Sequence, residues 1–422
     1  TGLLASSQGG GSPSCVEASL ARPRHPPTRT DTMPGFFADV PPSAPDPLLS
    51  IDGRFRADTR TSKLNLGIGV LRKQDSTSHE FATVLKAAKT VPVSTYYPSP
   101  AGDATFLKLS SEMVLGEVNP RVMAVQTVGG SGALRVCAEL LVSQGITDMM
   151  LPNPSWANHR PLLVGGGCKI SEYTYLKDET HTVDIDGMIK AIEGAPPKTA
   201  IMLQVAAHNP TGVDLTEEQW ERVLEVFKRR KDLFPVFDSA YQGLAKGLEE
   251  DVAVVRRFLK EDMEFIVCNS HSKNFGLYGE RVGSCFVACE SPEVAANVSS
   301  RCQLRIRWNY SVPPLFGARI VSTILGDPAM RSEWEAELKA AREQLNRAQT
   351  SLCGAIKDAG LPARLSSPKL GLFSQLFLTD AQVLSLEKDH GVYVGPGGRI
   401  NVSSLTDEAA KQVALAVCAV VK

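Results

Sequence analysis

From about residue 120 to residue 290, short apolar runs alternate with segments whose apolar residues recur at helical spacing. The apolar runs predict strands, because they are short and rich in β-branched and aromatic residues. A helix is predicted over 216–231, where Thr216 suits the N-cap and Gln219 follows three residues later. Strands alternating with helices predict an α/β protein with a mostly parallel sheet covered on both faces. The predicted strands are 124–128, 148–151, 200–205, 233–238, 264–269 and 284–288.

The pattern changes in the last quarter of the chain. Residues 330–359 form a long amphipathic stretch with few helix-breaking residues. This stretch predicts one helix that leaves a first domain and enters a second. Residues 361–422 lose the regular alternation and predict a smaller α+β unit that ends in a helix.

The beginning of the chain has a different composition. Residues 1–47 are rich in Gly, Ser and Pro and poor in large apolar residues, so most of this segment is predicted to be disordered. Met33 followed by PGFFADVPP is typical of a natural start, and we interpret residues 1–32 as non-native. Glu17 and Asp31 argue against a transit peptide. We expect a cytoplasmic protein, or a mitochondrial one if residues 1–32 are a native transit segment.

Composition narrows the function further. The chain has 45 Lys and Arg against 46 Asp and Glu, and its net charge of -1 predicts no nucleic-acid or membrane partner. No apolar run approaches the roughly 18 residues that a membrane helix needs. The nine cysteines include no CxxC pair and the seven histidines are dispersed, so we expect reduced core thiols and no metal site. These features are typical of a soluble globular protein.

Four stretches follow predicted strands, at the carboxyl ends where parallel sheets place their ligands. They are GGSGALR (129–135), HNPTG (208–212), FDSAY (237–241) and SHSKNFG (270–276). The first leads into a helix and aims backbone N–H groups at an anion, most naturally a phosphate. A glycine-rich turn alone is weak support for a phosphate site, because glycines at strand-to-helix junctions are often needed only for the conformation of the turn.

Lys273 and Asp238 suggest a specific chemistry. Taken alone, Lys273 would be a solvated loop lysine, and Asp238 would cap a helix or pair with an arginine. Together at neighbouring strand ends, they match the needs of pyridoxal phosphate (PLP). The lysine forms a Schiff base with the aldehyde, and the carboxylate keeps the pyridine nitrogen protonated. Tyr241 and Asn209 could hydrogen-bond the ring oxygen, although Tyr241 could also be a core tyrosine.

Six motifs, in their order along the chain, resemble the aspartate aminotransferase family of fold-type I PLP enzymes. They are LNLGIGV, NPSWANH, AAHNPTGVDLT, FDSAYQG, SHSKNFGLYGERVG and GGRINVSSL. The resemblance runs from about residue 37 to the C-terminus; the lysine motif is highly specific, whereas HNPTG is shared with wider aminotransferase families. With this fold we expect a large PLP-binding domain over 77–340 and a small domain formed by 48–76 and 341–422.

The resemblance implies roles around the cofactor ring. Lys273 would hold PLP covalently, Asp238 would contact the pyridine nitrogen, and Tyr241 and Asn209 would bond the ring oxygen. Catalysis is thereby assigned to Lys273, Asp238 and Tyr241. Trp156 matches the aromatic ring that stacks on the cofactor, since a flat indole suits this contact. A core tryptophan fits less well beside the polar residues that follow it.

The resemblance also implies a phosphate cradle. Arg281 would add a charge-assisted bond to the phosphate dianion. Tyr97 matches a tyrosine that reaches the cofactor phosphate of a neighbouring subunit, although the adjacent Tyr96 leaves the register open. The other members of the cradle are Gly130, Ser131 and Ser270.

Two arginines would select the substrate. Arg399 matches the residue that grips the α-carboxylate through a fork-to-fork bond. Arg307 matches the residue that reaches across a dimer interface to the side-chain carboxylate of aspartate or glutamate. Arg301 and Arg305 lie nearby, and the spacing to the following YSVPP selects Arg307. The remaining substrate contacts implied by the resemblance are Gly69, Trp156 and Asn209.

Two positions depart from the family pattern. Gly129 stands where a serine is common, and Val312 stands where an asparagine is common. The implied activity is ping-pong transamination between L-aspartate and 2-oxoglutarate by a homodimer with shared active sites. The alternatives are an aromatic or dual-specificity aminotransferase of the same family, and a non-catalytic scaffold. A Rossmann dehydrogenase is excluded because no GxGxxG follows a strand.

Overall fold

The computed structural model describes residues 35–43, 48–367 and 369–421. The chain divides into two units, residues 1–45 and residues 46–422. In the first unit the described residues contain a turn, in which the Ala38 amide donates to the Gly35 carbonyl at 2.8 Å. The interpretation of residues 1–32, and most of the predicted disorder over 1–47, concern residues outside those described.

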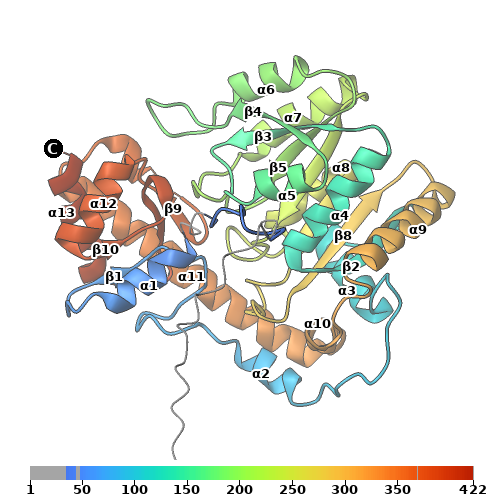
Figure 1. Cartoon of the computed structure of the whole chain (residues 1–422), viewed down its shortest axis with the longest axis horizontal. Coiled ribbons are helices and arrows are strands. Elements are labelled where there is room, and N and C mark those ends of the chain that lie inside the picture. The colour runs from blue at the N-terminus through green and yellow to red at the C-terminus, as the bar shows by residue number, and fades with distance from the viewer. Residues whose placement is uncertain (1–34, 44–47, 368, 422) are drawn as a thin grey trace, which may run out of the picture. The chain divides into compact units, whose positions relative to one another are not determined.

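A seven-stranded sheet forms the centre of the second unit, in the order β2-β8-β7-β6-β5-β3-β4 (Figure 1). Within this sheet β8 runs antiparallel to both of its neighbours, and the other pairs are parallel. The predicted mostly parallel sheet is therefore confirmed. The strands are β2 (Val122–Val128), β3 (Asp148–Asn153), β4 (Lys169–Thr174), β5 (Thr199–Gln204), β6 (Phe234–Ser239), β7 (Phe265–Ser270) and β8 (Val282–Ala288).

The six strands predicted from apolar runs are all present, but β4 was missed. Its sequence, KISEYT, lies at the edge of the sheet, and its side chains are exposed except for the partly buried Ile170 and the buried Tyr173. An edge strand with one solvated face carries no continuous apolar run. The signal used for the central strands therefore could not find it.

Helices cover both faces of the sheet, as predicted. Neighbouring residues on one strand belong to different apolar clusters: Val236 packs in one and Phe237 in the other. Because successive strand side chains point to opposite faces, the two clusters are the two layers of the core. The helices around the sheet are α3 (Ala104–Leu115), α4 (Gly129–Ser143), α5 (His159–Gly165), α6 (Ile185–Glu193), α7 (Glu217–Arg229), α8 (Ala253–Lys260), α9 (Pro292–Asn309) and α10 (Phe316–Gly326).

Two helix predictions are confirmed in detail. Helix α7 begins after Thr216, whose side chain accepts from the Gln219 amide while the Gln219 side chain accepts from Thr216 in return. The long helix is α11 (Pro328–Asp358), and Asp327 caps its first turn. Near the sheet, α2 (Ala82–Ala88) packs against α10 and α11.

Segments from both ends of the described chain lie side by side beyond α11 (Figure 1). Strand β1 (Leu64–Asn65) pairs with β10 (Val392–Tyr393), and β9 (Phe373–Gln375) pairs with β11 (Arg399–Asn401). Whether these elements form a separate small domain stays a prediction. No helix among the described residues is long and apolar enough to cross a membrane. The helices here are α1 (Leu49–Ala57), α12 (Asp380–His390) and α13 (Asp407–Val421).

Candidate active site

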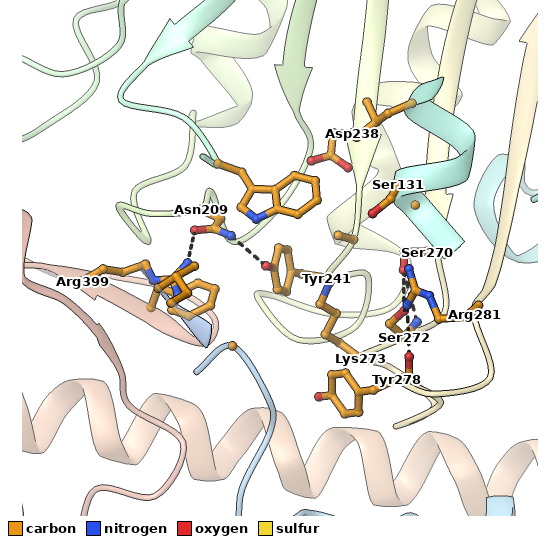
Figure 2. A pocket seen from close by; sticks show the side chains of 17 residues that line it. Ser131, Asn209, Asp238, Tyr241, Ser270, Ser272, Lys273, Tyr278, Arg281 and Arg399 are labelled. Carbon is orange, nitrogen blue, oxygen red and sulfur yellow. Dashed lines mark hydrogen bonds between the residues drawn. The ribbon is translucent and has the colours of Figure 1, made fainter. Parts of the chain in front are cut away.

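The four stretches singled out in the sequence meet at one edge of the sheet. Strands β5, β6 and β7 are parallel, and β2 runs the same way because β2 and β7 both pair antiparallel with β8. A cavity of about 240 Å³ lies at this edge (Figure 2). The predicted site residues that line it are Gly69, Gly130, Ser131, Trp156, Asn209, Asp238, Tyr241, Ser270, Lys273, Arg281 and Arg399.

Lys273 follows β7 and projects into this cavity. Its Nζ lies 5.1 Å from the centre of the Tyr241 ring. Burial lowers the pKa of the Lys273 amine to about 8, while the Asp238 carboxylate opposes this effect and the Arg281 and Arg399 cations add to it. A lysine with this pKa has a substantial neutral fraction near pH 7, and only the neutral amine can attack a carbonyl.

Asp238 ends β6 as a buried carboxylate with a histidine behind it. His159 Nε2 lies 3.0 Å from Asp238 Oδ2, and His159 Nδ1 lies 2.8 Å from the Ser155 hydroxyl. An ionised carboxylate only accepts, so Nε2 carries the proton that is donated to Asp238, and Nδ1 accepts from Ser155. The sequence reasoning missed this pair, because His159 lies 79 positions from Asp238 and no local pattern connects them.

Arg399 lies on the opposite side of the cavity from Arg281 (Figure 2). Its Nη2 donates to the Gly67 carbonyl at 2.8 Å and its Nη1 donates to Asn209 Oδ1 at 3.1 Å. The guanidinium also lies over the Phe373 ring, at 4.2 Å from the ring centre. Burial lowers the pKa of Arg399, its Nε has no hydrogen-bond partner, and no carboxylate among the described residues pairs with it. Such an arginine suits a carboxylate ligand.

Asn209 continues this chain of hydrogen bonds to Tyr241. The Asn209 Nδ2 donates to the Tyr241 hydroxyl at 3.2 Å. Burial raises the pKa of Tyr241, which keeps its hydroxyl protonated. The protonated hydroxyl remains able to donate to a negatively charged oxygen in the cavity.

The other side of the cavity gathers groups that suit a phosphate. Arg281 Nη1 donates to the Tyr278 carbonyl at 3.1 Å, and Ser270 and Ser272 are joined through their hydroxyls at 3.1 Å. Ser131 lies in the first turn of α4, where free backbone N–H groups favour an anion. A guanidinium, hydroxyls and a helix start fit the phosphate of PLP.

The departure at Gly129 has a structural reason. Gly129 has a φ of +66°, and a Cβ placed there would lie 2.6 Å from Arg281 Nη2. A side chain at this position would therefore be strained and would also displace the guanidinium. Arg281 takes up the space that a serine side chain would need.

Two predicted residues do not line the cavity of this chain. Tyr97 is 86% exposed. Arg307 lies exposed in the last turn of α9, where its Nη1 bonds the Ser311 hydroxyl. The resemblance placed both residues across a dimer interface, and their roles stay predictions.

Several lining residues were not predicted. Ser272 and Tyr278 belong to the lysine motif, so the motif could have predicted them. In the structure the Tyr278 hydroxyl also accepts a hydrogen bond from the Leu71 amide. Phe373 comes from β9, which the sequence reasoning did not identify. The other unpredicted lining residues are Leu48, Leu134 and Ala240.

The family model described as aminotransferase class I and II matches residues 61–417. The chain belongs to this aminotransferase family. Aspartate aminotransferase of Escherichia coli (strain K12) is 36% identical over 396 residues, which are 91% of this chain and 100% of the relative. Tyrosine aminotransferase of Rhizobium meliloti (strain 1021) is 38% identical over 384 residues, which are 90% of this chain and 98% of the relative.

A solved structure agrees with this aminotransferase along nearly its whole length. It is an aromatic-amino-acid aminotransferase from Burkholderia pseudomallei covalently bound to pyridoxal phosphate. Its TM-score is 0.86 at 36% sequence identity, covering 92% of this chain and 100% of that chain. Membership of the family makes PLP the cofactor, and the phosphate-binding groups, the lysine and the buried carboxylate of the cavity fit it.

Proposed function

We propose that this aminotransferase transfers the amino group of L-aspartate to 2-oxoglutarate by a ping-pong mechanism. The products are oxaloacetate and L-glutamate. The observation that carries the proposal is Arg399, a buried guanidinium without a carboxylate partner among the described residues, in the cavity that also holds Lys273. A substrate α-carboxylate would supply the missing charge. The similarity to an aspartate aminotransferase supports the choice of a dicarboxylic amino acid as the substrate.

PLP, when bound, supplies an aldehyde for the amino group and a ring that takes up electrons. Lys273 Nζ would hold the cofactor and, once released, would remove the proton from the substrate Cα as a general base and deliver it to the former aldehyde carbon of the cofactor as a general acid. Asp238, held by His159 Nε2, keeps a negative charge facing the ring nitrogen. Asn209 and Tyr241, which are joined by a hydrogen bond, would donate to the ring oxygen.

The remaining cavity residues orient the two partners. We assign the phosphate to Gly130, Ser131, Ser270 and Arg281. Of these, Ser131, Ser270 and Arg281 lie on the opposite side of the cavity from Arg399 (Figure 2). Trp156 would stack on one face of the ring, and the absence of a side chain at Gly69 would leave room for the substrate. A Cβ at Gly69 would lie 3.0 Å from the Phe373 ring, so a side chain there would crowd this space.

We assign the side-chain carboxylate to Arg307 of a second copy of the chain, and a phosphate contact to Tyr97 of that copy. Both residues are exposed and lie outside their own cavity, which supports a homodimer with shared sites. We further propose a small domain of 48–76 and 341–422, packed against a large domain of 77–340.

A second candidate is an aromatic or dual-specificity aminotransferase. The likenesses to a tyrosine and to an aromatic aminotransferase favour it. It also agrees with the absence of Arg307 from the cavity, since an apolar side chain needs no second guanidinium.

Turnover on aspartate and on phenylalanine, each with 2-oxoglutarate, separates the two candidates. We expect a higher kcat/KM for aspartate, and an Arg307→Leu change should lower it while sparing phenylalanine. Equal or higher kcat/KM for phenylalanine would establish the second candidate. A holoenzyme whose cofactor absorbance changes with neither amino acid would contradict both.

A further inference from the structure

A second cavity, apart from the active site, is lined by residues within 52–76 and 404–409. It measures about 350 Å³, and we call it the α1 cavity. Helix α1, strand β1 and the start of α13, which form its walls, lie side by side in Figure 1. Its polar lining residues are Asp52, Arg56, Lys63, Asn65, Arg72, Gln74, Ser76, Ser404 and Thr406.

Arg72 is the unusual member of this lining. Burial lowers the pKa of its guanidinium, and the charge of Asp52 opposes this effect. The side chain makes one hydrogen bond, from Nη1 to the Asn65 carbonyl at 3.2 Å, and pairs with no carboxylate among the described residues. A partly buried cation without a counter-ion is costly, and a bound anion would offset that cost.

Asp52, the acidic residue of this lining, already has partners. Asp52 pairs with Arg56 at 2.7 Å and accepts from Asn65 Nδ2 at 3.2 Å. Lys63 donates to the carbonyls of Phe55 and Asp58, so its ammonium is also engaged. Arg72 therefore remains the partly buried cation of this lining with free donors and no carboxylate partner, whereas Arg56 is exposed and paired with Asp52.

Neutral groups around Arg72 are unpaired as well. The Ser404 side chain is buried and the Gln74 side chain is exposed, and neither has a hydrogen-bond partner within the described residues. With Arg56, Lys63 and Arg72 against Asp52, the lining carries three cations and one anion, an excess of two positive charges. Donors and positive charge both suit an oxyanion.

We propose that the α1 cavity binds a small anion with a carboxylate or phosphate group through Arg72. A guanidinium fork matches either group in a bidentate manner. The proposal concerns binding at a separate cavity, so it does not rest on the substrate assigned above.

The α1 cavity connects to the active site through residues 65–72. Asn65 and Arg72 line the α1 cavity, whereas Gly67 accepts from Arg399 and Gly69 lines the active site. Asn401, two positions after Arg399, donates to the carbonyls of Ile68 and Val70 and holds this segment in place. An anion bound to Arg72 is therefore expected to change substrate affinity at Arg399, and the effect should be reciprocal.

Calorimetric titration of the holoenzyme with inorganic phosphate tests whether the anion is a phosphate. The active site should not bind this probe, because PLP already occupies the phosphate cradle. Titration with malonate tests whether the anion is a carboxylate. It uses an Arg399→Leu background, in which the proposed carboxylate-binding arginine of the active site is absent. The test variant is Arg72→Gln. Its matched control is Arg54→Gln on the same helix as Arg56, since Arg54 pairs with Glu387 and does not line the cavity.

We expect saturable binding of one probe that weakens by about tenfold or more in Arg72→Gln, as loss of a charge-assisted bond predicts. Binding in Arg54→Gln should stay within about twofold of the unchanged protein, because an exposed ion pair contributes little. Saturable binding of phosphate but not malonate would identify the ligand as a tetrahedral anion. Saturable binding of malonate but not phosphate would identify it as a carboxylate. If neither probe binds saturably, or if Arg72→Gln binds as well as Arg54→Gln, the proposal is wrong.

Stability gives an independent check. Without an added anion, Arg72→Gln should be at least as stable as Arg54→Gln, because the change removes an uncompensated charge. If Arg72→Gln fails to fold, Arg72→Lys replaces it in the titration. The lysine keeps the charge but loses the fork, and it should bind the probe more weakly than the unchanged protein. Equal affinity in Arg72→Lys would overturn the role given to the guanidinium.

Discussion

Arg399 and Arg307, two arginines expected to bind substrate carboxylates, lie in very different surroundings. Arg399 is buried in the active-site cavity and held by Asn209 and Gly67. Arg307 is exposed in the last turn of α9, and its Nη1 bonds the hydroxyl of Ser311, just past the end of the helix. One chain thus fixes the position of the residues proposed to bind the cofactor and the α-carboxylate, whereas the residue proposed to bind the side-chain carboxylate lies exposed.

The difference indicates which parts of the site a single chain can organise. Groups that meet at the carboxyl edge of a parallel sheet are positioned by strand pairing and core packing. A residue on an exposed helix end has no such constraint. A second copy of the chain would give Arg307 its position, and the following predictions test this division.

The largest effect is expected from Lys273→Ala. Removing the amine abolishes both the covalent hold on the cofactor and the proton transfer at the substrate Cα, so we expect the rate to fall by about a thousandfold or more. Steady-state turnover measures this loss, and circular dichroism should show an unchanged fold. A variant that retains near-normal turnover would remove Lys273 from catalysis.

Arg399→Leu and Arg307→Leu compare the two arginines directly. Loss of a charge-assisted, bidentate bond should lower kcat/KM by about a hundredfold. For Arg399 the loss should apply to aspartate and phenylalanine alike, because both carry the α-carboxylate. For Arg307 it should apply to aspartate. Equal losses from both changes on both substrates would mean that the two arginines do not differ in role.

Mixing two inactive variants sharpens the comparison further. In a hybrid dimer of Lys273→Ala and Arg307→Leu chains, one site would carry both changes and the other would carry neither. Random mixing of the subunits should therefore restore about a quarter of the normal activity on aspartate. Unmixed samples of each variant are the controls. No recovery in hybrids shown to form would place Arg307 in the site of its own chain.

The pH dependence of cofactor attachment tests the surroundings of Lys273. In the chain without cofactor, the lowered pKa means that the amine is neutral above about pH 8. The rate of covalent PLP attachment, followed by absorbance, should rise with pH and level off above this value. Asp238 raises this pKa, so Asp238→Asn should move the midpoint to lower pH. A midpoint near the ordinary lysine value would contradict the burial of the amine.

The same pKa shift affects stability. Between about pH 8 and pH 10.5 the unfolded chain holds the Lys273 proton and the folded chain without cofactor has released it. The contribution of Lys273 to the free energy of unfolding therefore rises with pH across this range and is lost as the pH falls through it. Lys273→Met should remove this pH dependence in a thermal melt.

The smallest effect is expected from Gly129→Ala. The methyl group would meet Arg281 Nη2 and would require a left-handed backbone, which costs an L residue about 1–2 kcal/mol. We expect a lower melting temperature and weaker PLP binding, measured by reconstitution. Gly145→Ala is a matched control, because this glycine also has a positive φ but faces no atom within 4 Å. Equal PLP affinity in the two variants would show that Gly129 does not position Arg281.

The central strands of the sheet could be predicted from the sequence, whereas the edge strand β4 could not. Strands β5, β6 and β7 are buried along their whole length, so each appears as an apolar run. Helix α7 was readable because its capping box is a local signal. Strand β4 and the short strand β9 lack such signals.

The sequence by itself determined the chemistry of this protein: the alternation of strands and helices and the order of the six motifs were enough for the family and the cofactor. Periodicity and motif spacing are local properties, which a chain displays before it folds. Only the tertiary structure decided that His159 supports Asp238, that Arg281 fills the space beside Gly129, and that Arg72 faces a second cavity. These contacts join residues far apart in the chain, and they exist only once the sheet and the packed helices bring them together.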